Sequence, residues 1–106
     1  MYKRQSYVRT RNGKFTEFDA PGAAGAGTAA FSINLFGGVT GEFFDVNNVM
    51  HGFSRSAGGV FATFDAPDGG RGAFQGTRPS TNNAEGTVAG WYVDANNLNH
   101  GFVWKP

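Results

Sequence analysis

The apolar positions of this chain fall in short runs of aromatic and β-branched residues, and clusters of Gly, Asn and Asp separate these runs. No window holds the i, i+3, i+4 spacing of an amphipathic helix, whereas short runs bounded by turn residues are typical of strands. We therefore expect an all-β chain. The pattern predicts nine strands, near residues 7–10, 14–19, 28–34, 38–44, 51–55, 59–65, 77–82, 86–93 and 100–104.

The residues between the runs have the chemistry of tight turns. Asn12-Gly13 and Gly58-Gly59 suit hairpin turns that need a positive φ. The segments 45–48 and 94–97 are rich in Asp and Asn, whose side chains accept hydrogen bonds from their own backbone in turns. The turns therefore predict neighbouring antiparallel strands.

Apolar residues occupy both faces of the predicted strands. In 86–93, Val88, Gly90 and Tyr92 share one face, while Ala89, Trp91 and Val93 share the other. A sheet with one wet face would alternate apolar and polar residues, so we expect cover on both faces. Gly41 and Gly90 fall within strands, where the missing side chain permits a bulge or the close approach of another backbone.

The chain contains an internal repeat. Residues 38–53 match residues 87–102 at an offset of 49 positions, and Phe18-Asp19-Ala20-Pro21 recurs as Phe64-Asp65-Ala66-Pro67 at an offset of 46. Repeats of this length are supersecondary units that bury their apolar faces against one another. We divide the single domain 7–106 into a partial unit 7–21, a unit 22–67 and an incomplete unit 68–106. Four short antiparallel strands per unit match a β-propeller blade, so about two blades are expected.

Residues 1–6 have no counterpart in the repeat. We interpret this start as not native, and it is left out of the fold prediction.

The repeated residues resemble the HAF family of extracellular repeats. The matching residues are Asn34, Gly38-Val39-Thr40-Gly41, Asp45 and His51-Gly52-Phe53, and then Asn83, Gly86-Thr87-Val88-Ala89-Gly90, Asp94 and His100-Gly101-Phe102. The chain has Gly where the family signature His-Ala-Phe has Ala. The resemblance implies a propeller-like fold and a secreted or cell-surface location, and it brings no common enzymatic activity.

Composition and charge exclude several classes of function. The chain has no cysteine, so it has neither a disulfide framework nor a thiolate metal site. Its formal net charge of +1 comes without a basic stripe, so no nucleic-acid partner is expected. No apolar run is long enough to span a membrane. Residues 25–30 match a dinucleotide fingerprint, but no helical period follows them, and no cofactor is expected.

Five residues are candidates for ligand binding: Asp45, His51, Trp91, Asp94 and His100. The two histidines could serve as ligands or general bases. Because they recur in identical contexts, we favour a role in holding turns over metal binding. The Asp45 and Asp94 segments lack the ligand spacing and the glycine of a calcium loop. Trp91 could stack on a sugar ring, although packing within the β core is the favoured interpretation.

These observations predict a non-enzymatic extracellular module that binds a ligand, a carbohydrate or a protein. A purely structural module and a fragment of a propeller enzyme are the alternatives. Because residues 7–10 and 100–104 are the same element of the repeat, each end leaves an open strand edge. We therefore expect the chain to form a homo-oligomer.

Overall fold

The computed structural model describes residues 5–9, 13, 15–24 and 27–106. These residues form nine strands and no helix, and therefore none that could cross a membrane. The strands are β1 (Ser6–Arg9), β2 (Phe15–Phe18), β3 (Thr28–Ile33), β4 (Val39–Phe44), β5 (Met50–Arg55), β6 (Phe61–Phe64), β7 (Gly76–Asn82), β8 (Val88–Val93) and β9 (Asn99–Trp104). The all-β prediction is confirmed, and each described strand end lies within two residues of its predicted position. Residues 10 and 14 of the predicted strands lie outside the described residues, as do Asn12 and residues 1–4 of the start.

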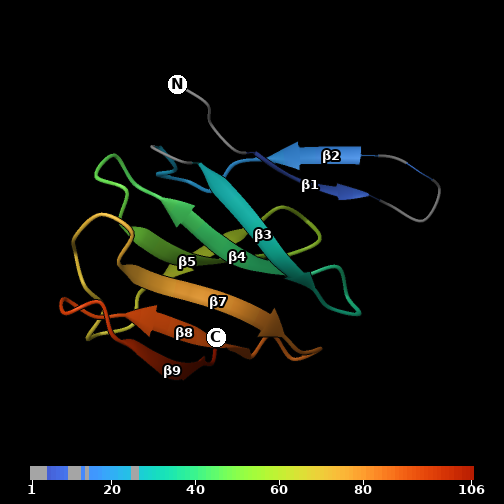
Figure 1. The fold of residues 1–106 in the computed structure, drawn as a ribbon. Coiled ribbons are helices and arrows are strands. Elements are labelled where there is room, and N and C mark those ends of the chain that lie inside the picture. Colours follow the sequence, from blue (N-terminus) through green and yellow to red (C-terminus); the bar gives the residue numbers. More distant parts are fainter. Residues whose placement is uncertain (1–4, 10–12, 14, 25–26) are drawn as a thin grey trace.

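Consecutive strands pair antiparallel in three groups (Figure 1). The groups are the β1–β2 hairpin, the β3–β6 meander and the β7–β9 meander. One parallel residue pair, Met50 with Gly76, joins the two meanders in the described part of the chain.

Glycine within β4 and β8 allows a bulge in the neighbouring strand. The register of β3 shifts between Ala30 and Ser32, opposite Gly41. A Cβ atom at Gly41 would overlap the carbonyl oxygen of Ala29. Gly90 faces the same kind of bulge in β7, between Pro79 and Thr81. The close backbone approach expected at both glycines is therefore confirmed.

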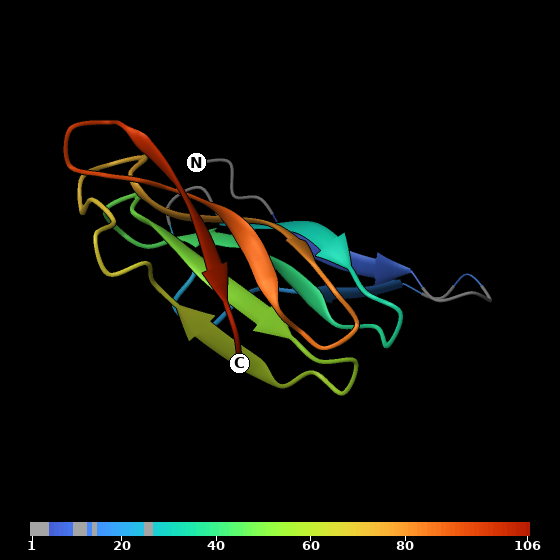
Figure 2. The same cartoon turned by 90° about the horizontal axis from the view of Figure 1, so that it is seen from below.

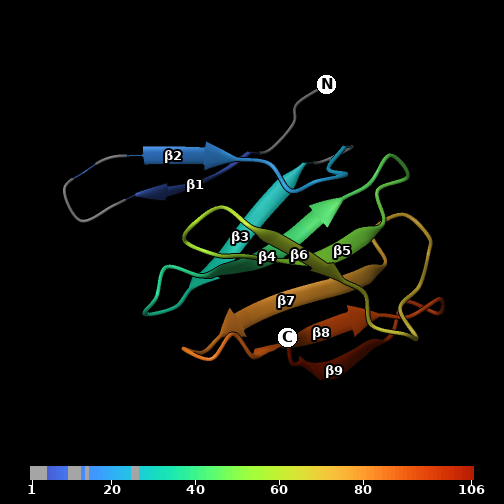
Figure 3. The same cartoon turned by 180° about the vertical axis from the view of Figure 1, so that it is seen from behind.

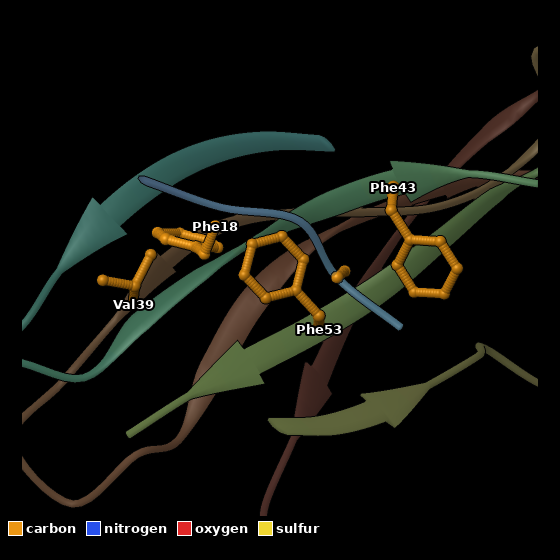
Figure 4. Close-up of a cluster of buried hydrophobic side chains, with 5 residues drawn as sticks. Phe18, Val39, Phe43 and Phe53 are labelled. Carbon is orange, nitrogen blue, oxygen red and sulfur yellow. The ribbon is translucent and has the colours of Figure 1, made fainter. Parts of the chain in front are cut away.

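The β1–β2 hairpin covers one face of the β3–β6 meander. Phe18 of β2 packs against Phe53 of β5, with ring centroids 6.0 Å apart, and Ala20, Val39 and Phe43 complete the cluster (Figure 4). Phe53 is fully buried. This cluster is the larger hydrophobic core.

The β7–β9 meander lies on the other side of the β3–β6 meander (Figure 1, Figure 3). Phe64 pairs with Gly52, which neighbours Phe53, so Phe64 and Phe53 point to opposite faces. Trp104 of β9 stacks on Phe64 with centroids 4.1 Å apart, where β9 crosses β6 (Figure 2). The β1–β2 hairpin and the β7–β9 meander thus cover the two faces of the β3–β6 meander, and every residue of β4 is buried. The strand β9, by contrast, is largely exposed.

Candidate functional site

The turn between β4 and β5 is held by Asp45. Its Oδ1 accepts hydrogen bonds from the backbone amides of Asn47 and Val49, at 2.8 and 3.1 Å. Asn48 adopts a φ of 60°, a conformation that Asn tolerates better than most residues. The turn predicted at 45–48 is therefore present, and it directs Oδ2 of Asp45 towards β5.

His51 on β5 is held by two carboxylates. Its Nε2 lies 2.8 Å from Oδ2 of Asp45, and its Nδ1 lies 2.6 Å from Oδ1 of Asp65, which follows β6. The imidazole also stacks on Phe43, with centroids 5.1 Å apart. Both ring nitrogens are therefore engaged, and the ring orientation is fixed.

His100 on β9 repeats this geometry in part. Its Nε2 lies 2.7 Å from Oδ2 of Asp94, whose Oδ1 accepts from the amides of Asn96 and Leu98. Tyr92 stacks on His100 as Phe43 stacks on His51. No described carboxylate bonds to Nδ1 of His100, and no described strand pairs with β9 as β6 pairs with β5.

These contacts shift the pKa values of the groups involved. Burial alone would lower the pKa of His51, but the hydrogen bonds to Asp45 and Asp65 outweigh it and raise the pKa above its ordinary value. Burial alone would raise the pKa of Asp45, but His51 and the amides of Val49 and Asn47 lower it. The pKa of Asp94 is lowered mainly by its hydrogen bond to His100.

A pocket of about 500 Å³ opens beside His51, between the turn after β4 and the loop that leads from β6 to β7. The side chain of Asp65 is 60% exposed, and Asp65 and Arg71 are among the residues that line this pocket. The remaining lining residues are Asp45, Asn47, Val49, Met50, Ala66, Pro67, Gly69, Gly70, Gly76 and Thr77. The residues that line the pocket therefore include carboxylates, which accept hydrogen bonds, and a cationic arginine.

The side chain of Trp91 points to the opposite face of the sheet from His100, since Trp91 pairs with Gly101 and Tyr92 pairs with His100. It packs against the buried cluster of Phe44, Met50 and Val93. The guanidinium of Arg78 sits 5.3 Å from the centre of its ring and bonds Glu42 at 3.0 Å. Arg78 therefore covers one face of the ring, and a sugar cannot stack there.

The structure brings some of the candidate residues together and separates others. Asp45 joins His51, and Asp94 joins His100, but the two pairs belong to different meanders. Asp65 and Arg71 were not among the candidates, although the recurrence of Asp65 within the Phe-Asp-Ala-Pro segment was a signal that could have found it. Arg71 lies in a loop that is three residues longer than the corresponding loop after Pro21, so the repeat did not mark it.

No group of three or more His, Cys, Asp or Glu side chains in the described part of the chain is arranged to hold a metal ion. His51 has no free ring nitrogen to offer, because a carboxylate occupies each one.

Comparison with protein-family models found no match, and no similar curated protein or solved structure was found either. The function is therefore inferred from the geometry of the site.

Proposed function

We infer that the chain belongs to an extracellular propeller-like repeat protein of the HAF type. On this proposal β3–β6 is one blade, β7–β9 is three strands of the next, and β1–β2 is the end of the one before. Recurring contacts support it. Thr28 Oγ1 accepts from the amide of Ala20, and Thr77 Oγ1 accepts from the amide of Ala66. Ala20 and Ala66 are matching positions of the repeat at the offset of 46, and Thr28 and Thr77 match at the offset of 49.

The proposed activity is non-enzymatic binding of a carbohydrate in the pocket beside His51. The observation that carries this proposal is the set of groups on the pocket wall. Asp65 bonds His51 with one carboxylate oxygen, and its 60% exposed side chain leaves the other able to accept from a sugar hydroxyl. Arg71 adds a donor. A small set of convergent polar groups in a pocket is the usual form of a specific ligand site.

Binding is favoured over catalysis because the one imidazole of the pocket is already held at both nitrogens. A general base needs a nitrogen within reach of the proton that it removes. In the described pocket His51 has none that is not bonded to an aspartate.

A glycan array followed by thermal shift tests the proposal. A saturating saccharide, at about 100 times its Kd, should stabilise the chain by roughly 2.7 kcal/mol. Asp65→Asn and Arg71→Ala should weaken binding, while Glu85→Gln, an exposed carboxylate outside this pocket, should not. A lack of response to every saccharide would favour the purely structural module instead. Turnover of a bound saccharide would contradict the non-enzymatic assignment and favour the propeller enzyme.

A further inference from the structure

The outer edge of β9 is not paired with any described strand. The equivalent strand, β5, pairs with β4 on one side and with β6 on the other. In the described part of the chain β9 pairs with β8 alone. The backbone groups on its other edge are therefore available to a further strand.

The β5–β6 pair shows what such a strand must carry. Phe64 lies opposite Gly52, and its ring occupies the space where a Cβ atom of Gly52 would be. Phe61, three residues earlier, packs on Phe53 with centroids 5.9 Å apart. Asp65, directly after Phe64, bonds Nδ1 of His51. The fitting pattern is Phe-x-x-Phe-Asp.

The β9 strand has the three residues that correspond to those contacted by β6 on β5. Gly101 corresponds to Gly52, but the nearest atom to a Cβ built there is the Gly90 carbonyl oxygen, 3.9 Å away. Phe102 corresponds to Phe53 and is half-buried. His100 corresponds to His51 and lacks its second aspartate among the described residues. The three residues of β5 that β6 contacts therefore have counterparts on β9 that no described strand contacts in the same way.

The chain carries a second strand of this pattern, in β2. Phe15, Phe18 and Asp19 match Phe61, Phe64 and Asp65 at the offset of 46. Phe18 lies opposite Ser6 of β1, the position that Gly52 holds in β5.

We propose that β9 of one copy pairs antiparallel with β2 of a second copy and takes the place of β1 there. Phe18 of the second copy then covers Gly101, and its Asp19 reaches Nδ1 of His100. The exchange removes the hydrogen bonds of the Ser6 hydroxyl with Thr28 and Ala30 and the bond of the Gln5 amide with Asp19, and the new ion pair offsets this loss. Contacts of this kind are head-to-tail, so they build rings or open chains of copies. The inference does not depend on the ligand pocket.

Paired cysteines test the register of this contact. Ser54 lies opposite Ala62 in the β5–β6 pair, so Val103 should lie opposite Thr16 of the second copy. The protein has no cysteine of its own. The β3–β6 meander separates β2 from β9 within one chain (Figure 1, Figure 3), so a disulfide between them must join two copies.

The variant Thr16→Cys/Val103→Cys should form covalent oligomers on non-reducing gels. The control Glu17→Cys/Val103→Cys should not, because neighbouring residues of a strand point to opposite faces. Equal cross-linking of both variants, or none in the first, would overturn the proposal.

A substitution at Gly101 provides a second measurement. In a single copy the Cβ atom of Gly101→Val meets no atom nearer than the Gly90 carbonyl oxygen, 3.9 Å away, while its side chain would occupy the space proposed for Phe18. Sedimentation velocity should give the wild-type chain a concentration-dependent mass above 11.3 kDa, and the variant a single-chain mass with an unchanged circular dichroism spectrum. The control Val103→Thr should behave like the wild type, since the equivalent position is Ser54. A monomeric wild type, or assembly of Gly101→Val equal to that of the wild type, would refute the strand exchange.

Discussion

The pair of Asp45 and His51 shows how one residue can organise a turn and a side chain together. One carboxylate oxygen of Asp45 accepts from two backbone amides, and the other holds the imidazole. Asp94 does the same for His100. The same residues therefore produce the same geometry twice.

We predict that the chain is most stable in mild acid. The raised pKa of His51 means that folding favours its protonated form. That contribution is complete below the unfolded pKa of about 6.5 and is lost as the pH rises through the folded value. The lowered pKa of Asp45 contributes above an unfolded pKa of about 3.9 and is lost as the pH falls through the folded value.

The melting temperature should therefore be higher at pH 5.5 than at pH 8. His51→Gln keeps a polar side chain but cannot titrate, so its melting temperature should fall less between these two pH values. A drop of the same size in wild type and variant would show that another group is responsible.

We predict that Gly41 tolerates no side chain. A Cβ atom there would overlap backbone atoms of Ala29 and approach Ala30, and backbone cannot move aside as a flexible side chain can. Gly41→Ala should lower the free energy of unfolding by about 2–3 kcal/mol. Gly101→Ala, at an open position, should change it by less than about 0.5 kcal/mol. Urea denaturation measures both, and equal effects would contradict the overlap.

At the scale of the elements, the turns do more than reverse the chain. Asn34 lies between β3 and β4, and its Oδ1 accepts from the amides of Phe36 and Gly38. Asn83 makes the same pair of bonds between β7 and β8. The Nδ2 of Asn34 also donates to the carbonyl of Asn83, at 2.9 Å. One turn therefore holds its own hairpin and ties the two meanders together.

Asn34→Ala and Asn83→Ala should consequently differ in stability. Both lose the two bonds within their own turn, but Asn34→Ala also loses the bond to the other meander. The free energy of unfolding should be about 0.5–1.5 kcal/mol lower for Asn34→Ala, the usual net contribution of one hydrogen bond. Chemical denaturation of the two variants side by side measures the difference, and equal stabilities would show that the cross-link contributes nothing.

At the scale of the whole molecule, an ion pair between the buried Glu42 and the partly exposed Arg78 joins strands that are distant in sequence. Glu42 on β4 is 1% exposed and bonds Arg78 on β7, whose guanidinium also faces Trp91 of β8. Charged groups are rarely buried without a partner. The pair therefore fixes how the β7–β9 meander sits on the β3–β6 meander.

Removing the cation alone should be strongly destabilising. Arg78→Met leaves the buried Glu42 carboxylate without its guanidinium, and we expect the free energy of unfolding to fall by about 3 kcal/mol. The double variant Glu42→Gln/Arg78→Met removes both charges and should recover part of this loss. Arg71→Ala, at an exposed arginine, is the control and should change stability by less than about 0.5 kcal/mol. A double variant no more stable than the single one would show that charge burial is not the cause.

The sequence by itself determined the nine strands, the turns at 45–48 and 94–97, and the two glycines that face bulges. These features depend on neighbouring residues, because strand periodicity and turn chemistry act over a few positions of the chain. The positive φ of Gly59 follows from the same local rule.

Only the tertiary structure decided which distant residues meet. Asp65 reaches His51 because β6 pairs with β5 in one register, and Arg78 reaches Glu42 because β7 lies against the β3–β6 meander. The parallel pair of Met50 and Gly76 was likewise not expected. Such contacts depend on how separate strands stack and on which register they adopt, and hydrophobic patterning leaves that stacking open because apolar residues occupy both faces of these strands.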